Sequence, residues 1–329
     1  LPFSIWSVIA SLVIIASASW FLRDDTFKLI RQFLKTGRRQ ILITELVFFA
    51  AFLGFTLVRM GNPDIAQTEK MPDFAFLTGI VTSDHFPPRD PWFADGTINY
   101  FYYGHYLVGL MTKATVVAPE YGYNLGIAFI FAMTLLNAIG ISLGLIRKLY
   151  FGILGGLFVA FIGNLDCAVQ FFTNLGDFAS GAKKIFPFSW FNWWMSSRVI
   201  VREGIDITIN EFPFWSYILG DLHAHMNVVP ISLVVLAIVL ELFRNSGSGL
   251  DILGTGREKW FRLPVIAIAL GAVPCANTWD LPTYYALVAA AMLIGRKVAG
   301  SRDLTEGSDS PMSVSVLSLA VAPVTEICD

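Results

Sequence analysis

Charged residues and cysteines are both scarce in this sequence. Asp, Glu, Lys and Arg account for 15% of the 329 residues, whereas hydrophobic residues account for 55%. In soluble domains about a quarter of the residues are charged. Lys and Arg are scattered over several connections and nowhere form the basic face that a nucleic acid requires. The composition therefore predicts an integral membrane protein and excludes nucleic acid as a partner.

The three cysteines, Cys167, Cys275 and Cys328, lie in or beside apolar runs without the spacing of metal ligands. A disulfide framework and a cysteine-bound zinc ion are therefore excluded. Residues 1–22 have neither the basic start nor the small-residue cleavage site of a signal peptide, so we expect them to form a span. The chain begins at Leu1 and ends just after a short apolar run, so we expect it to be part of a longer protein.

Long apolar runs, in contrast, are abundant. A helix needs about 20 predominantly apolar residues to cross the hydrocarbon core of a membrane. Runs of about this length occur at residues 1–22, 40–58, 124–146, 149–172 and 226–243. Shorter runs occur at residues 260–278, 280–295 and 311–327. The predicted fold class is therefore an all-α, polytopic transmembrane helix bundle of about seven or eight spans.

The Lys and Arg residues orient this bundle, because they accumulate in cytoplasmic connections. Most of them lie in four short connections, residues 23–39, 147–148, 244–262 and 296–302. The two long connections, residues 59–123 and 173–225, then face the outer side. We divide the chain into an N-terminal module of residues 1–243 with these two outer loops, a cytoplasmic linker of residues 244–262, and further spans in residues 263–329.

The first outer loop contains an amphipathic segment beside an acidic residue. In "PDFAFLTGIVTS" the apolar residues recur at spacings of three and four, which predicts a helix lying along the membrane interface. Asp73 is at the start of this helix, where the helix dipole favours a carboxylate. Two interpretations of Asp73 stay open at this point: a helix cap, or a group with a chemical role.

The stretch "INYFYYGHYL" then collects hydroxyls and rings before an apolar run. On a helix, Tyr100, Tyr103 and Tyr106 would share one face, with Tyr102 and His105 beside it. Tyrosines gather at membrane interfaces for general reasons. A face of hydroxyls and rings also suits a sugar or a phosphate, through stacking and hydrogen bonds. We therefore predict that Tyr100, Tyr102, Tyr103 and His105 bind substrate.

The second outer loop contributes cations and carboxylates. Arg198 and Arg202 are predicted to bind phosphate, for which the planar guanidinium group is suited. The alternative is that both pair with nearby acidic residues at the interface. Glu211, in "INEFPFW", is a further candidate for substrate binding.

The motif "DLHAHM" places Asp221, His223 and His225 at alternate positions just before a span. These residue types bind divalent metals, and a phosphate-bearing substrate would favour Mg or Mn. Hydrogen bonding to a donor diphosphate and a plain interfacial polar cluster are the alternatives. A site with all three ligands requires a break in the helix, because these positions do not share a helical face.

Polar residues also occur inside or between apolar runs. Asn277 and Asp280 lie where two short spans meet, in "NTWDLP". Such groups usually face the bundle interior or a water-filled cavity, so we predict that both bind substrate. By the same reasoning we expect Glu45 to have a partner within the bundle, and Asn164 and Asp166 either to line a cavity or to join helices.

The order of these features resembles a known superfamily. A span, an acidic residue, an amphipathic helix, a proline-rich crossing and an aromatic helix resemble the first outer loop of membrane glycosyltransferases of the GT-C type. More closely, "INYFYYGHY", "SRVI", "INEFPFWSYILGDLHAHM" and "NTWDLP" resemble the YYY or DUF2298 family of polytopic membrane proteins from bacteria and archaea, which is grouped with that superfamily. The resemblance covers most of residues 40–295. It implies a GT-C-like bundle in the plasma membrane of a prokaryote, with interfacial helices in its outer loops.

In GT-C enzymes the acidic residue that opens the first outer loop acts at the active site. The resemblance therefore implies Asp73 as the catalytic residue, with Glu69 as the second candidate. Many relatives have two adjacent acids here, whereas this chain has "EKMPD", with Lys70 and Pro72 interposed. This departure leaves the division of roles between Glu69 and Asp73 open.

Three hypotheses of function follow. The first is a glycosyltransferase that takes a sugar from a lipid-phosphate-linked donor on the outer face and passes it to an acceptor that the sequence does not specify. The second is a transporter or flippase of lipid-linked sugars, and the third is a non-catalytic protein of the cell envelope. Transporters concentrate polar groups at mid-membrane between inverted repeats. Here the dense motifs lie in outer loops and no inverted repeat is evident, which favours the enzyme.

Overall fold

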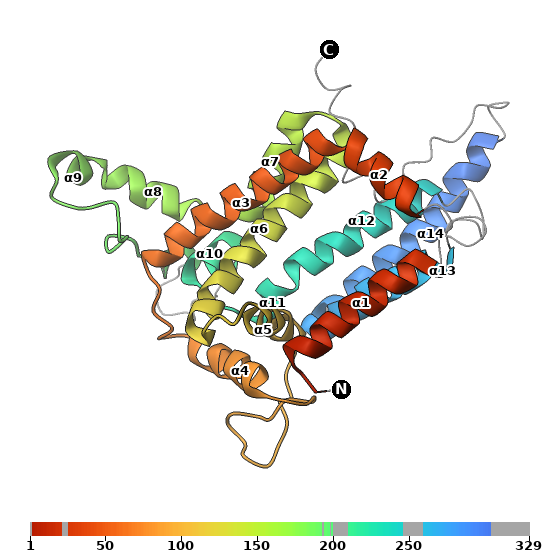
Figure 1. The fold of residues 1–329 in the computed structure, drawn as a ribbon. Coiled ribbons are helices and arrows are strands. Elements are labelled where there is room, and N and C mark those ends of the chain that lie inside the picture. Colours follow the sequence, from red (N-terminus) through yellow and green to blue (C-terminus); the bar gives the residue numbers. More distant parts are fainter. Residues whose placement is uncertain are drawn as a thin grey trace.

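The computed structural model describes residues 2–21, 26–192, 194–197, 199, 210–245 and 259–303, and these fold into helices and connecting loops (Figure 1). The described residues form no β-strand, only an isolated bridge between Arg89 and Thr97. The helices are α1 (Ile5–Phe21), α2 (Thr26–Thr36), α3 (Arg38–Met60), α4 (Lys70–Thr82), α5 (Tyr103–Thr115), α6 (Pro119–Ile146), α7 (Leu149–Phe161), α8 (Asp166–Thr173), α9 (Leu175–Ser180), α10 (Pro213–Leu219), α11 (Ala224–Asn227), α12 (Val229–Asn245), α13 (Lys259–Ala276) and α14 (Leu281–Asp303). Two short 3₁₀ turns, η1 (Met195–Ser197) and η4 (Thr278–Asp280), complete the described elements.

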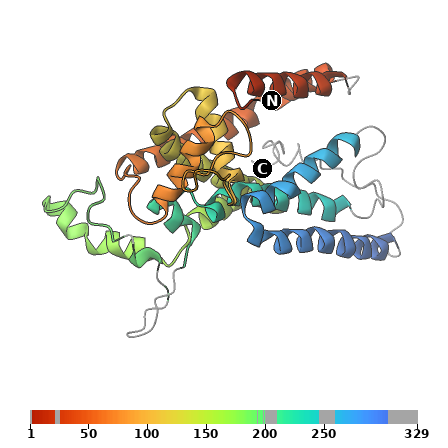
Figure 2. The same ribbon diagram turned by 90° about the horizontal axis from the view of Figure 1, so that it is seen from below.

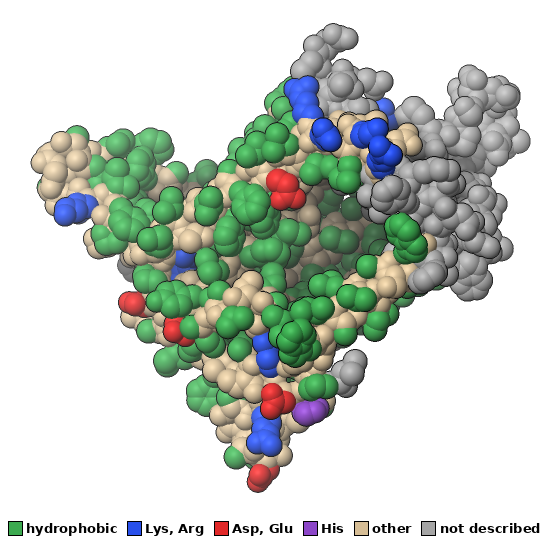
Figure 3. Space-filling view, viewed as in Figure 1, with side chains coloured by type: hydrophobic (Ala, Val, Ile, Leu, Met, Phe, Trp, Pro, Cys, Tyr) green, Lys and Arg blue, Asp and Glu red, His purple; other side chains and the backbone are tan. Residues whose placement is uncertain are grey.

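Helix α6 lies at the centre of the bundle. It packs against α3 and α7 on one side and against α12 on another, and it also contacts α4 and α5. Helices α12, α13 and α14 form a second group that lies side by side (Figure 2). The largest buried apolar cluster joins α3, α4, α5, α6 and α10, and includes Phe55, Leu77, Ile127 and Tyr217. Hydrophobic side chains also cover much of the outside, as Figure 3 shows over α1 and α3, which fits a surface that faces lipid.

Three of the described helices are long and apolar enough to cross a membrane: Arg38–Met60, Pro119–Ile146 and Ala224–Arg244. They match the runs predicted at residues 40–58, 124–146 and 226–243. The runs at the N-terminus and at 260–278 are helical too, but their apolar stretches, Ile5–Ala18 and Arg262–Ala276, are shorter than a full span. The run at 280–295 lies within α14, and the run at 311–327 falls outside the described residues. The described residues therefore contain three such helices, or four if one bent pair counts as a span.

The run predicted as a span at residues 149–172 forms two helices, which count as one span only if the bent pair is taken together. Helix α7 ends at Phe161, and α8 leaves at an angle of 87° to it. The break has a local cause: Leu165 has a left-handed backbone (φ +62°), and the side-chain oxygen of Asn164 accepts a hydrogen bond from the backbone N–H of Asp166 (3.1 Å). This bond satisfies a backbone N–H group in the first turn of α8. Helices α8 and α9 consequently form an arm that projects from the bundle (Figure 1).

Two further expectations are changed by the structure. Glu45 is exposed on α3, although we expected it to have a partner inside the bundle. Helix α5 begins at Tyr103, so Tyr100 precedes the helix and does not share a face with Tyr103 and Tyr106.

Candidate functional site

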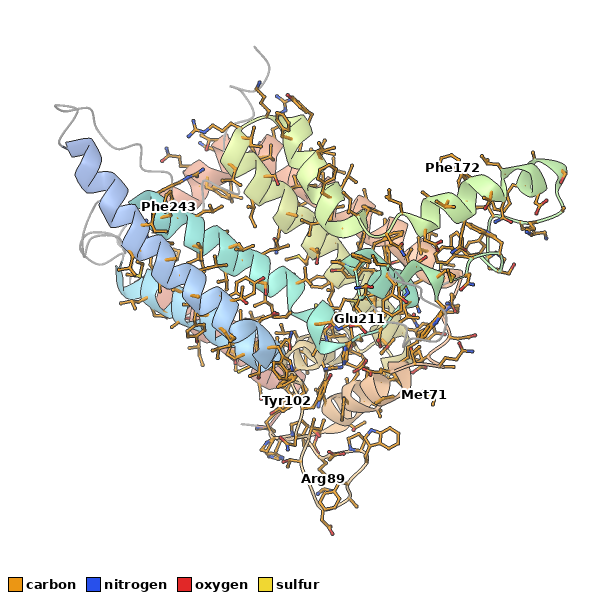
Figure 4. The ribbon with its side chains drawn as sticks, turned by 180° about the vertical axis from the view of Figure 1, so that it is seen from behind. Met71, Arg89, Tyr102, Phe172, Glu211 and Phe243 are labelled. Carbon is orange, nitrogen blue, oxygen red and sulfur yellow. The ribbon has the colours of Figure 1, made fainter. Side chains whose placement is uncertain are left out.

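The predicted site residues meet at one end of the bundle, where α4, α5, α10 and α11 converge. In Figure 4 the labels of Tyr102 and Glu211 mark this region, while Arg89 lies on the loop below it and Phe172 on the projecting arm. The four helices come from segments up to about 150 residues apart in the sequence, so the site exists only in the folded chain.

Asp73 points into this region from the first turn of α4. The helix begins at Lys70 and its cap position belongs to Glu69, so Asp73 does not cap it. Instead, Oδ1 of Asp73 lies 3.0 Å from Nε2 of His105 on α5. Both side chains are buried, and His105 is fully so. His105 therefore contacts the carboxyl of Asp73 from the buried side. We predicted that His105 binds substrate, but its side chain is not at the surface.

Asp221 lies beside Asp73 in the turn between α10 and α11. The two carboxyls are close enough to share a proton. Oδ2 of Asp73 and Oδ1 of Asp221 are buried and receive no hydrogen bond from any donor group in the described part of the chain. Burial and the Asp73 carboxylate next to it raise the pKa of Asp221 to about 8. Asp221 is therefore largely protonated at neutral pH, and its proton can lie between the two carboxyls.

The turn that carries Asp221 packs against Arg59 from a distant helix. Gly220 has a left-handed backbone (φ +76°), and a Cβ atom there would lie 2.1 Å from Nη1 of Arg59. Glycine is the residue that allows both the turn and this close approach. The buried Arg59 donates to Oδ1 of Asn124 (3.1 and 2.9 Å) and to the carbonyl of Ile218 (3.4 Å). The Asp221 position is therefore fixed by a buried cation of α3.

A second cation, Lys70, is buried on the same side. Its Nζ donates to the carbonyl of Asp64 (3.4 Å). Burial and the positive charge of Arg59 lower the pKa of Lys70 to about 8, although Asp221 and Asp64 oppose this shift. Lys70 and Arg59 thus place positive charge behind the buried carboxyls.

His223 brings the aromatic motif and the first acidic motif together. Its Nε2 lies 2.6 Å from the hydroxyl of Tyr100 and 2.9 Å from Oε2 of Glu69. The Tyr100 ring also stacks on Phe76 at 5.3 Å. Burial, together with the carboxylates of Asp73, Glu69, Asp221 and Glu211, raises the pKa of the Tyr100 hydroxyl above its ordinary value. Tyr100 is therefore a neutral hydrogen-bonding group inside an acidic cluster.

His225 continues the cluster towards α10. Its Nδ1 lies 2.7 Å from Nδ1 of His223, and its Nε2 lies 3.1 Å from Oγ of Ser216 and 3.5 Å from Oε2 of Glu211. The turn around residues 220–223 leaves the helical path before α11 begins, which is the break that the alternate spacing of the motif requires.

The predicted metal ligands are distributed over two groups that share His223. One ligand atom each from Glu211, His223 and His225 lies within 4.8 Å of the others, and the same holds for Glu69, Asp221 and His223. The predicted trio of Asp221, His223 and His225 is therefore divided between these groups, and the two glutamates join it.

The other tyrosines of the aromatic motif point elsewhere. Tyr102 packs near Ile98 and faces the ring of Phe86. Tyr103 packs against the cluster formed by α12, α13 and α14 and stacks on Tyr106. Among the three predicted substrate tyrosines, the structure brings Tyr100 alone to the acidic cluster.

A cavity of about 370 Å³ connects this cluster to the "NTWD" turn. Glu211, Ser216 and His225 line it on one side and Asn277 and Asp280 on the other. Asn277 donates to Oδ2 of Asp280 (3.2 Å). The two polar residues at the meeting point of α13 and α14 thus face a cavity, as polar groups at membrane depth generally do.

A larger, almost wholly apolar chamber of about 730 Å³ lies on the other face of α10. It is enclosed by α3, α6, α7, α10 and the projecting arm, and is lined by Gly54, Phe161, Trp190 and Trp215 among others. Asn164 and Asp166 are near its entrance, where Asn164 donates to the carbonyl of Met195 and Asp166 accepts from Ser196 (both 3.1 Å). These bonds join the arm to η1.

The sequence reading missed Arg59, Lys70 and Asn124 as parts of the site. Arg59 and Lys70 were both visible as cations in the first part of the outer connection 59–123. The outer connections contain few cations. Asn124 carried no comparable signal, because its role depends on the position of Arg59. Arg198 and Arg202, the predicted phosphate ligands, lie outside the described residues.

Comparison with known proteins gives the family. No curated protein and no solved structure matches the chain. The model of the family described as uncharacterized membrane protein, DUF2298, matches residues 1–325. The chain with this buried acidic cluster at the end of its helix bundle therefore belongs to the DUF2298 family of membrane proteins.

Proposed function

We propose that this protein is a membrane glycosyltransferase of the GT-C type, which transfers a sugar from a lipid-phosphate-linked donor on the outer face of the membrane. One observation carries the proposal: Glu69, Asp73 and Asp221 converge with Tyr100 and His223 at the end of a membrane bundle. Sugar transfer needs a base for the acceptor and negative charge beside an oxocarbenium-like centre. The cluster has both kinds of group.

In the proposed reaction, the acceptor hydroxyl oxygen forms a bond to C1 of the sugar. The bond between C1 and the phosphate oxygen breaks, and the lipid phosphate leaves with the bonding electrons. The proton of the hydroxyl passes to a carboxylate. Glu69 is 62% exposed, whereas Asp73 is 3% exposed, so Glu69 is the carboxylate that an acceptor reaches first and we assign the proton to it.

Asp73 and Asp221 lie deeper in the protein than Glu69. Their buried negative charge stabilises the positive charge of the transition state. Tyr100 offers a ring and a hydroxyl to the sugar. The apolar chamber beside α10 has the size and lining for part of the lipid chain. Arg198 and Arg202 are proposed to bind the donor phosphate.

The test is transfer of radiolabel from polyprenyl-phosphate sugars in membranes that contain the protein at matched levels. Glu69→Gln is expected to lower the rate by about 10²- to 10⁴-fold, the usual contribution of a general base. Asp73→Asn is expected to lower it less, since the hydrogen bond to His105 can persist. The control is Asp95→Asn, which removes an exposed carboxylate from the same outer loop and leaves the rate unchanged.

A larger loss with Asp73→Asn than with Glu69→Gln would assign the proton to Asp73 instead. If the wild type binds or moves the labelled lipid but transfers no sugar, the glycosyltransferase proposal fails and the flippase takes its place.

A further inference from the structure

Two imidazoles in the cluster face each other through their Nδ1 atoms. Nδ1 of His223 lies 2.7 Å from Nδ1 of His225, with the ring planes at 74°. One metal ion bound by both rings, about 2.0–2.1 Å from each nitrogen, would place the two nitrogens about 3.3 Å apart. A shift of a few tenths of an ångström therefore converts the observed pair into a pair of metal ligands.

Glu211 completes a ligand set. Its carboxylate oxygen and one nitrogen from each histidine lie within 4.8 Å of one another. The side chain is 43% exposed, so it can move towards an ion without unpacking the core. Glu211 and His225 also line the cavity of about 370 Å³, which gives an ion a path from solvent and room for water as a further ligand.

The hydrogen bonds around His223 select this set over the alternative of Glu69, Asp221 and His223. Nε2 of His223 is already in contact with Glu69 and Tyr100. A proton on Nε2, donated to these oxygens, leaves the lone pair on Nδ1, which faces His225. Metal-binding histidines are commonly oriented in this way by a carboxylate on the other ring nitrogen. Glu69 and Tyr100 thus act as positioning residues for the ligand.

A second observation points to a cation at this place. Oδ1 of Asp221 is buried without a donor in the described part of the chain, and the residue is 7% exposed. A carboxylate oxygen of Asp221 lies within 4.8 Å of ligand atoms of Glu69 and His223. Three carboxyl groups, those of Glu69, Glu211 and Asp221, lie at the two histidines. A divalent cation would offset their repulsion.

We propose that Glu211, His223 and His225 bind one divalent transition-metal ion of the zinc type. Two imidazoles and one carboxylate are the ligands of many catalytic zinc sites, which keep a further position open. Magnesium, in contrast, prefers oxygen ligands in octahedral geometry, so the folded site favours a different ion from the Mg or Mn expected from the sequence. The proposal does not depend on sugar transfer.

The experiment measures zinc binding to the purified protein in detergent after removal of metal by a chelator, by calorimetry and by metal analysis after dialysis. One zinc ion per chain is expected, with no binding of magnesium at the same site. His225→Ala and Glu211→Gln are expected to weaken zinc binding by about 100-fold or more, and Tyr100→Phe by about 10- to 100-fold. His85→Ala, which removes an exposed histidine of the first outer loop, is the matched control and keeps full affinity.

Glu211→Gln preserves the shape of a half-exposed side chain, and a thermal unfolding curve confirms that each variant is folded. The proposal is overturned if the wild type binds no zinc, if His85→Ala weakens binding as much as His225→Ala, or if folded Glu211→Gln binds zinc with unchanged affinity. Each of these results concerns the metal alone and leaves the test of sugar transfer independent.

Discussion

The protonation of Lys70 depends on the surroundings of its side chain. In the sequence it is a lysine between two acids, and in the fold it is 4% exposed, beside Arg59 and within reach of Asp221. An ammonium group loses its hydration on burial, so the neutral form becomes easier to reach. The same burial makes Lys70 a test of how the site is packed.

We predict a rise in stability with pH that depends on Lys70. Its pKa is about 8 in the folded protein and 10.5 as the ordinary value. Between these pH values the unfolded chain holds a proton that the folded chain has released, so the free energy of unfolding increases as the pH rises through this window, by about 3 kcal/mol in total. Thermal unfolding of the protein in detergent, followed by tryptophan fluorescence from pH 7 to pH 10.5, measures the effect.

The variant Lys70→Met is expected to lack this rise, while Lys184→Met, which changes an exposed lysine, keeps it. An equal pH dependence in wild type and Lys70→Met would show that Lys70 is hydrated in the folded protein.

At the scale of elements, the bend between α7 and α8 changes how the chain meets the membrane. Helix α8 leaves α7 at an angle of 87°, so the two helices cannot both run along the membrane normal. Leu165, Val169 and Phe172 recur at helical spacing and are 57–66% exposed. Gln170, on another face, binds Asn192 through its side chain. The arm thus has one free apolar face and one face that is hydrogen-bonded to its own loop.

We predict that α8 lies in the membrane interface with its Val169 face towards lipid. Spin labels attached at position 169 or 172, in a variant without native cysteines, are expected to be accessible to oxygen dissolved in the bilayer and protected from a water-soluble relaxation agent. A label at Asp177 on α9, which is half exposed beside Lys183, is the aqueous comparison. Strong relaxation of the Val169 label by the water-soluble agent would place the arm outside the membrane.

At the scale of the molecule, α10 separates two spaces of different chemistry. Its Ser216 faces the smaller cavity with Glu211 and His225, and its Trp215 faces the apolar chamber. A polar reaction centre and an apolar chain site would therefore be adjacent, as the proposed donor with its polar head and lipid tail requires.

Filling the apolar chamber tests this arrangement. Gly54 lines it, and a Cβ atom at Gly54 would meet nothing within 4 Å, so Gly54→Phe has room for its first side-chain atom and adds bulk at the wall of the chamber. We predict that it raises KM for a long-chain lipid donor by about tenfold while a short-chain donor keeps its KM, because only the long chain loses buried apolar surface. Gly140→Phe is the matched control, since Gly140 has the same free space and lies outside the chamber lining. An equal change for both donors would place the lipid chain elsewhere.

Local patterns were sufficient to predict much of the fold. The runs at residues 40–58, 124–146 and 226–243 form helices of spanning length, and the segment around Asp73 to Thr82 forms α4. The family resemblance of the motifs is confirmed by the match over residues 1–325. These features depend on composition and spacing within one segment, which a sequence displays directly.

The bend after Phe161 was harder to predict, because a left-handed backbone at Leu165 is a local exception that hydropathy averages over. The site was predictable as a list of residue types but not as an arrangement. Tyr100, Glu69 and His223 meet, whereas Tyr102 and Tyr103 turn away, although all belong to motifs of equal prominence in the sequence.

The sequence by itself determined that this chain is a helical membrane protein, and where its chemically active residue types lie, since hydrophobic length and residue identity are properties of each segment alone. Only the tertiary structure decided that His105 supports Asp73, that Arg59 holds the turn of Asp221, and that Glu211 joins the two histidines. The reason is physical: burial, charge coupling and ligand geometry depend on distances between segments, and packing around α6 sets those distances.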